Sequence, residues 1–384
     1  MSIMRRANPE IESVGLVLSG GGAKGAYQAG VWKALVETGV AGRITAISGT
    51  SIGAVNAAAF ASIHDPERIK RIWHRRISSV LSPNFKALSP IEVLTGIERW
   101  MEGQQFPFQG ILDRDVVSQL LSEELPDALW PSASPAVYAT ALEMRGAAFD
   151  ELNQSSYRKA RFRIDQEHDR GKRVKKILAS CAMPWCYSPV EIDGRRYVDG
   201  GWDEMGGENV PVTPILKNHP EIKTIIVIRC NSRDIEPTDI RLPRLSNVRV
   251  VEIRPEKPLP GIFDLGNLGG GILAGALFPG LPGGIVLRAA IAAISGFFMT
   301  TKAKIWGATL AFSSDYTDQY FDVGYRDGLA ALAHTNLDLL SESDSCAAFK
   351  GKNSEYSTAH EQKGSRKEDG HEKTCTFCGD QRLR

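Results

Sequence analysis

The feature that most constrains the fold of this chain is a strand, a glycine turn and a helix-compatible stretch, a pattern that occurs twice in succession. Residues 14–19 (VGLVLS) form an apolar run that ends at glycines, and the apolar residues after it are spaced as in a helix. Residues 44–48 (ITAIS) then lead through a second glycine turn into the small residues at 54–61. Two such units predict a three-layer α/β fold in which helices flank a largely parallel central sheet.

Caps and apolar runs predict the elements farther along the chain. The expected helix starts are Asp65-Pro66, Ser89-Pro90 and Asp113, the expected strands are 136–143, 224–229 and 248–254, and a closing helix is expected over 325–340. Asp193-Gly194 predicts the turn of a hairpin, EID-GRRYVDGG. Asp199 lies at the end of this hairpin, in a loop that is bounded by glycines.

Composition limits the classes of function. The chain has 384 residues, 42% of them hydrophobic, and a net charge of +1, which is unlike a dedicated nucleic-acid binder. Residues 1–13 contain no apolar run, so we expect a cytoplasmic protein without a secretory signal or anchor. The six cysteines are too sparse for a disulfide framework. Cys375 and Cys378, with His371 nearby, form only one C-x-x-C pair, so no metal site is predicted.

Gly49-Thr50-Ser51-Ile52-Gly53 is a candidate nucleophile turn. A serine hydroxyl is a weak nucleophile unless it is held exposed beside a base and near donors for the developing oxyanion. A G-x-S-x-G turn between strand and helix presents the serine in this way, and Gly49 and Gly53 allow strand and helix to approach closely. The alternative is an ordinary turn in which Ser51 only caps the helix, and the motif alone does not decide between the two.

A second glycine loop, Gly20-Gly21-Gly22-Ala23-Lys24-Gly25, lies one strand earlier. In a parallel sheet its amides reach the same edge as Ser51, and consecutive glycines can direct several N–H groups at one anionic oxygen. The loop also fits the dinucleotide pattern G-x-G-x-x-G. That interpretation is weakened because the second strand ends at Ser48 without the carboxylate that binds a ribose, and a Walker A loop fails because Lys24 is followed by glycine.

Three motifs in order, GGGAKG at residues 20–25, GTSIG at 49–53 and DGG at 199–201, resemble the patatin-like phospholipase family. The segments 177–184 (ILASCAMP), 209–212 (NVPV) and 324–328 (GYRDG) are similar to that family as well, and the resemblance spans about residues 14–335. It implies a patatin-like fold, with Ser51 as nucleophile and Asp199 as its base. The other implied site residues are the oxyanion donors Gly20, Gly21 and Gly22, the basic loop residue Lys24, and Gly200 and Gly201 beside the aspartate.

The implied reaction is hydrolysis of a phospholipid or other lipid ester through an acyl-enzyme, without a cofactor or metal. Asp199 would take the Ser51 proton, and we expect desolvation to raise its basicity. Two alternatives stay open: a Ser-His-Asp esterase with His219 or His334 as base, and a catalytically silent lipid-binding protein. The sequence does not predict the headgroup, the acyl position, a regulator or the oligomeric state.

We expect an N-terminal tail at residues 1–13, a patatin-like acyl hydrolase domain at 14–340 and a polar, disordered tail at 341–384. The glycine-rich apolar insertion at 261–299 is interpreted either as a membrane-facing lid or as an insert with a core helix. Two basic runs, at 68–76 and 158–176, are interpreted either as solvated helix faces and loops or as contacts for anionic lipid headgroups. Peripheral membrane contact is therefore one expectation.

Overall fold

The computed structural model describes most of the predicted domain, and every element below lies in the unit Met1–Asp338. The described residues are 13–63, 65–76, 80, 112–125, 135–145, 154–184, 186–237, 247–260 and 311–335. Several predictions lie outside them: the helix at Ser89-Pro90, the insertion at 261–299, the terminal tails and the Cys375/Cys378 pair. Among the helices that are described, none combines the length and the apolar composition of a membrane span.

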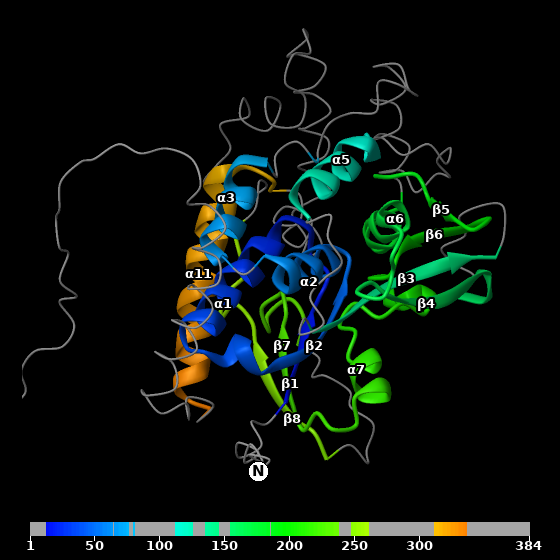
Figure 1. The fold of residues 1–384 in the computed structure, drawn as a ribbon. Coiled ribbons are helices and arrows are strands. Elements are labelled where there is room, and N and C mark those ends of the chain that lie inside the picture. Colours follow the sequence, from blue (N-terminus) through cyan, green and yellow to red (C-terminus); the bar gives the residue numbers. More distant parts are fainter. Residues whose placement is uncertain are drawn as a thin grey trace, which may run out of the picture. The chain divides into compact units, whose positions relative to one another are not determined.

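An eight-stranded sheet runs through the described fold (Figure 1). The strands are β1 Val14–Leu18, β2 Ile44–Thr50, β3 Ala136–Met144, β4 Tyr157–Arg163, β5 Val190–Ile192, β6 Arg195–Asp199, β7 Thr224–Ile228 and β8 Arg249–Ile253. Their order is β5-β6-β3-β2-β1-β7-β8, and β4 also pairs with β3. The pairs from β8 to β3 are parallel, whereas those that β4, β5 and β6 make are antiparallel. The predicted strands and the largely parallel sheet are thus confirmed.

Helices cover both faces of this sheet (Figure 1). They are α1 Gly25–Glu37, α2 Ile52–Ser62, α3 Pro66–Arg76, α5 Arg114–Glu124, α6 Arg170–Cys181, α7 Thr213–Asn218 and α11 Ser314–Ala333. Along β1, Leu16 and Leu18 belong to the larger hydrophobic cluster, whereas Val17 belongs to the cluster that contains Ile215 of α7. Alternate residues of a strand point to opposite faces, so a strand that is apolar throughout is buried on both sides. The three layers predicted from the sequence are therefore present.

Strand β3 brings the ends of β2 and β6 together. On one edge, β3 pairs first with β2, up to Thr140 opposite Thr50, and then with β6, starting at Ala141 opposite Asp199. Its other edge is occupied along both parts by β4. Strands β2 and β6 therefore lie end to end, and their last residues meet at neighbouring positions of β3.

The closing helix begins earlier than predicted. α11 starts at Ser314, whereas the sequence interpretation placed its start at Tyr325. It approaches α1 closely, because a Cβ at Gly30 would lie 1.9 Å from the backbone oxygen of Phe321. A Cβ at Gly324 would likewise lie 2.0 Å from the backbone oxygen of Tyr27. Glycine is required at both contacts, and α11 thereby supports the helix that follows the glycine loop.

The basic runs have acidic partners within the described fold. In α3, Arg68 and Arg76 both pair with Glu124 of α5, and Lys70 pairs with Asp322 of α11. These contacts join three helices, so much of the positive charge of this run is balanced within the fold.

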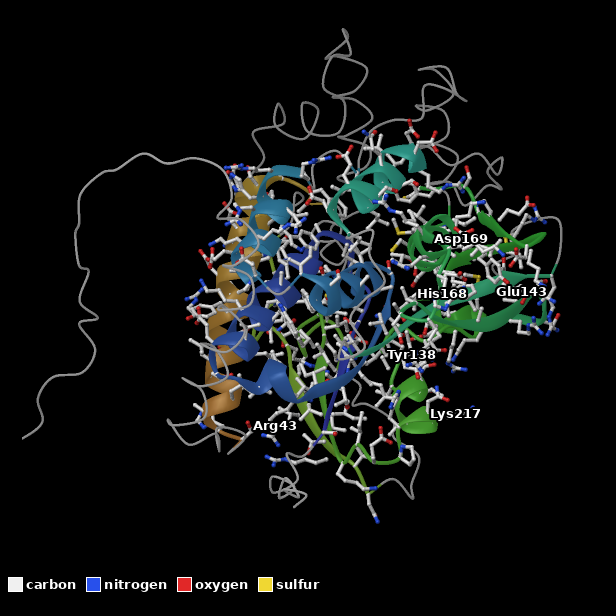
Figure 2. All side chains as sticks on the ribbon, viewed as in Figure 1. Arg43, Tyr138, Glu143, His168, Asp169 and Lys217 are labelled. Carbon is white, nitrogen blue, oxygen red and sulfur yellow. The ribbon has the colours of Figure 1, made fainter. Side chains whose placement is uncertain are left out.

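One of the two interpretations of the second run, as solvated helix faces and loops, is wrong for its first part, which forms β4. Arg158 pairs with Glu143 of β3, and Arg161 pairs with Glu208. In Figure 2, Glu143 and Tyr138 mark the two ends of β3. The basic side chains of β4 are thus matched by acids on its neighbours, which explains how so charged a segment forms a strand.

Candidate active site

Ser51 lies at the tight turn from β2 to α2 and has a strained backbone. Its φ is 56° and its ψ is −128°, a combination that residues other than glycine rarely adopt. A Cβ at Gly49 would lie 2.1 Å from the Gly53 oxygen, and one at Gly53 would lie 2.3 Å from the Leu18 oxygen. In the described structure the Ser51 side chain makes no capping bond to α2. The half-buried Ser51 therefore does not act as a side-chain cap of α2 in the described structure.

Asp199 ends β6 and is 4% exposed. Burial raises the pKa of its carboxyl from 3.8 to about 6, although hydrogen bonds from the Ser51 side chain and the Gly201 amide act in the opposite direction. The Gly201 N–H donates to Oδ1 of Asp199 at 2.7 Å. A Cβ at Gly200 would lie 2.3 Å from the Thr140 oxygen, so glycine lets this loop pass close to β3. The structure therefore brings Ser51 and Asp199 together.

The glycine loop lies against the same serine. A Cβ at Gly20 would lie 3.2 Å from Cβ of Ser51. Gly22 has a φ of 58°, which glycine adopts without strain. The Gly20 N–H lies 3.1 Å from both the side-chain and the backbone oxygen of Asn209. In the sequence, the segment around Asn209 is only similar to that of a family, and nothing there indicates that this side chain holds the loop.

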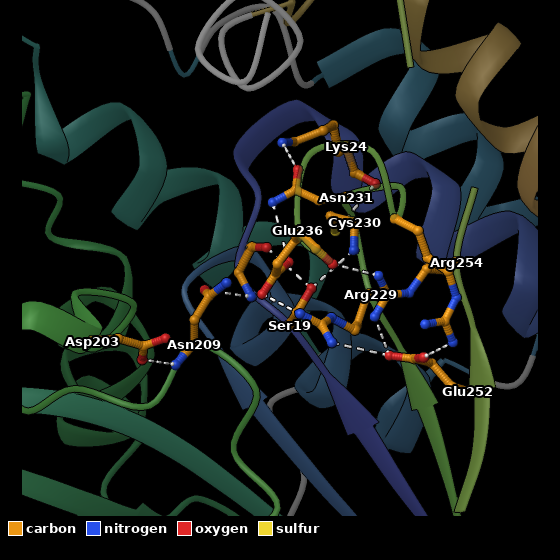
Figure 3. A network of polar contacts seen from close by, with 12 residues as sticks. Ser19, Lys24, Asp203, Asn209, Arg229, Cys230, Asn231, Glu236, Glu252 and Arg254 are labelled. Carbon is orange, nitrogen blue, oxygen red and sulfur yellow. Dashed lines mark hydrogen bonds and ion pairs between the residues drawn. The ribbon is translucent and has the colours of Figure 1, made fainter. Parts of the chain in front are cut away.

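Lys24 is buried behind the loop, and its side chain extends toward the segment after β7 (Figure 3). Its Nζ donates to Oδ1 of Asn231 at 2.6 Å. Burial lowers the pKa of Lys24 to about 8, while attraction to Cys230 and Glu236 opposes this effect. The Cys230 amide donates to Oγ of Ser19 at 3.0 Å, so the same segment also holds the start of the loop. Lys24 thus belongs to a polar support for the glycine loop.

Helix α6 also reaches Ser51. The Ser51 N–H donates to Oγ of Ser180 at 2.9 Å, and Sγ of Cys181 donates to the Ser51 carbonyl oxygen at 3.0 Å. Burial, followed by repulsion from Asp199, raises the pKa of Cys181 well above its ordinary value, so this thiol stays protonated. Neither contact is visible in the sequence, because only the folded chain brings the end of α6 beside the turn after β2.

Of the two histidines considered as bases, His219 bonds to other side chains and His334 lies at the end of α11. Nε2 of His219 lies 3.0 Å from the Tyr138 hydroxyl, and its Nδ1 lies 3.0 Å from Glu221. Tyr138 belongs to the cluster on the α7 face of the sheet (Figure 2). His334 caps the C-terminal end of α11. Among the described residues, Ser51 and Gly201 are the groups that hydrogen bond to the carboxylate of Asp199, and no histidine does so.

Comparisons with known proteins show the family of this chain. The family model described as patatin-like phospholipase matches residues 16–216, a stretch that contains the glycine loop, the nucleophile turn and the D-G-G motif. The human patatin-like phospholipase domain-containing protein 6 is 39% identical over 228 residues, covering 58% of this chain and 14% of the human protein.

Two further relatives come from microorganisms. An uncharacterized NTE family protein of Mycobacterium tuberculosis is 28% identical over 230 residues, covering 58% of this chain and 52% of that protein. Lysophospholipase nte1 of Aspergillus terreus is 61% identical over 49 residues, covering 13% of this chain and 3% of the fungal protein. The chain matches about half the length of the mycobacterial relative and much less of the others. Because the family model matches more than half of its residues, the chain belongs to the patatin-like phospholipase family of hydrolases.

Proposed function

We propose that this chain is a lipid acyl hydrolase in which Ser51 is the nucleophile and Asp199 is its base. One observation supports this most directly: a strained serine hydrogen bonds to a buried aspartate whose pKa is raised to about 6. Such a carboxylate is ionised at neutral pH and is nevertheless a stronger base than an aspartate in water. The nucleophile and its base are therefore paired before a substrate binds.

In the proposed reaction, Asp199 accepts the Ser51 proton while Oγ attacks the carbonyl carbon of the ester. The π electrons of the carbonyl move to its oxygen, which becomes the tetrahedral oxyanion. The intermediate then collapses, the bond to the alcohol breaks, and Asp199 returns the proton to the leaving alcohol. Water gives a proton to Asp199 as it attacks the acyl-enzyme, and the fatty acid leaves when Ser51 regains its proton.

We place the oxyanion hole at the amides of Gly21 and Gly22. The Gly20 N–H, which was also expected to contribute, already points at the oxygens of Asn209. Gly20 is therefore assigned a supporting role, with Asn209 and Lys24 holding the loop from two sides. Amides that are held in advance stabilise the oxyanion without reorganising during the reaction.

The proposed substrate class is a phospholipid or lysophospholipid ester. The names of the family and of the fungal relative support this class. The proposed hydrolase domain comprises residues 14–340. Peripheral contact with a membrane is proposed as well, because the ester bonds of such substrates lie near the bilayer surface. The cytoplasmic location stays a prediction from the sequence.

The test is a panel of phospholipids, lysophospholipids and neutral glycerides, assayed with the wild-type chain beside Ser51→Ala and Asp199→Asn. We expect either change to lower fatty acid release by roughly a thousandfold or more, because the two residues act as a pair. A fluorophosphonate probe should label the wild type and not Ser51→Ala.

Asp193→Asn, at the exposed turn of the hairpin, is the matched control and should keep full activity. Substantial turnover by Ser51→Ala would contradict the proposal. A folded wild-type chain that binds lipid but takes up no probe would indicate a silent lipid-binding protein instead.

A further inference from the structure

We propose that the end of α6, at Ser180, Cys181 and Ala182, is a positioning element that sets the spacing between Ser51 and Asp199. The inference rests on the function proposed above for those two residues. It starts from the observation that three consecutive residues hydrogen bond to the backbones of both members of the dyad.

Ser180 connects the backbone of Ser51 to strand β3. It is fully buried, and its Oγ accepts the N–H of Ser51 at 2.9 Å while donating to the Thr140 carbonyl at 2.6 Å. Thr140 is the residue of β3 opposite the end of β2. One hydroxyl thus ties the strained peptide of the nucleophile to the strand that determines where β2 and β6 meet.

The next two residues complete the element. Sγ of Cys181 donates to the Ser51 carbonyl oxygen at 3.0 Å, an oxygen that also accepts the Ala54 N–H in the first turn of α2. The Ala182 carbonyl accepts the N–H of Asp199 at 2.9 Å. The same short segment therefore fixes the backbone of the nucleophile and that of its base.

These contacts hold the strained backbone of Ser51 in place. A backbone in a rare conformation persists only when its surroundings hold it there, and here the held residue is the nucleophile itself. Strand β3 sets the ends of β2 and β6 side by side, whereas α6 links Ser51 and Asp199 through one continuous piece of chain. Displacements of about 1 Å at a reacting centre cost on the order of a hundredfold in rate. Loss of this link should therefore slow the chemistry more than it weakens substrate binding.

Ser180→Ala tests the proposal on a short soluble ester. Alanine keeps the Cβ but removes the acceptor of the Ser51 N–H and the donor to the Thr140 carbonyl. We expect kcat to fall about 10- to 100-fold with KM nearly unchanged. The rate at which a fluorophosphonate labels Ser51 should fall in parallel. The acidic limb of the kcat profile should also move to higher pH, because the bond from Ser51 lowers the pKa of Asp199.

Ser48→Ala is the matched control. Ser48 lies on β2 just before the nucleophile turn, is fully buried and, within the described part of the chain, has a hydroxyl without a hydrogen-bond partner. Ser48→Ala thus also deletes a buried serine hydroxyl near the site, but it leaves the hydrogen bonds of Ser51 intact. Its kcat, labelling rate and pH profile should therefore match the wild type. Ser180→Cys, whose thiol is a weak donor and acceptor, should recover part of the activity that alanine loses.

Cys181 provides a second test that does not depend on the folding of Ser180→Ala. Cys181→Ser keeps a donor at this position, whereas Cys181→Ala removes it. We expect Cys181→Ala to have the lower kcat of the two, again with little change in KM.

A Ser180→Ala protein that matches Ser48→Ala in kcat, labelling rate and pH profile would overturn the positioning role. A second contradicting result is that less of the Ser180→Ala protein takes up the probe, while kcat per labelled site stays unchanged. Ser180 would then have a structural role alone. If Cys181→Ala and Cys181→Ser are equally active, the element does not include Cys181. Activity in Ser51→Ala is a separate result, because it would reject Ser51 as the nucleophile and with it the proposed function.

Discussion

The buried carboxyl of Asp199 links the chemistry of the site to the stability of the fold. Its pKa is raised from 3.8 to about 6, so at neutral pH the folded chain holds an ionised group that water would solvate better. The stability that its protonated form contributes is fully present below pH 3.8 and is lost as the pH rises through about 6. The two pKa values correspond to a loss on the order of 3 kcal/mol.

Asp199→Asn is therefore expected to raise the melting temperature at a pH well above 6, even though it removes the proposed base. The difference from the wild type should shrink as the pH falls toward 3.8, which thermal unfolding at several pH values can follow. Asp193→Asn is the control, because the pKa of that exposed carboxyl is lowered by its hydrogen bond with Lys172. It should not stabilise the fold. A lower melting temperature for Asp199→Asn above pH 6 would contradict the prediction.

Some residues of the site could be predicted from the sequence, and others could not. Ser51 and Asp199 stand in short glycine motifs whose backbone requirements are local, so the sequence pointed to both. Ser180 and Asn209 bond to backbone groups of segments far away in the sequence, and nothing next to them signals this. Their roles depend on which strands become neighbours, and this is known only once the sheet order is known.

At the scale of elements, the contact between α1 and α11 depends on glycine. Gly324→Ala is expected to lower the free energy of unfolding by about 1–3 kcal/mol or more, because its Cβ would meet the Tyr27 oxygen at 2.0 Å. Gly42→Ala is the control, since a Cβ there meets nothing within 4 Å. Its effect should stay within about 0.5 kcal/mol. Chemical denaturation of both variants measures the difference, and equal stabilities would show that the two helices can separate freely.

The elements themselves were predictable where apolar side chains form them. β1, β2, β3 and β7 are largely apolar and mostly buried, and all four were expected. β4 was missed because its sequence, YRKARFR, is mostly basic, and its charges are balanced only by acids on other segments. The start of α11 was missed because its first turns are polar, although Ser313 and Asp315 are common residues at the start of a helix.

At the scale of the whole molecule, the site and its supports lie in one unit of the chain. Every described element ends by Ala333, and the proposed domain ends at residue 340. A chain shortened to residues 1–340 should keep the melting temperature and the kcat of the full chain. A chain that ends within α11 should lose both, because α1 would lose its partner. A lower melting temperature for the longer fragment would show that residues 341–384 stabilise the fold.

The end-to-end meeting of β2 and β6 along β3 has a consequence for how such a site can diversify. The proposed catalytic pair is joined through strand pairing and α6, so we expect its geometry to depend little on the lengths of the segments that connect these elements. We therefore expect insertions and exchanges in those connecting segments to leave the pair intact. Loops from other members of the family are therefore suitable for grafting onto this scaffold.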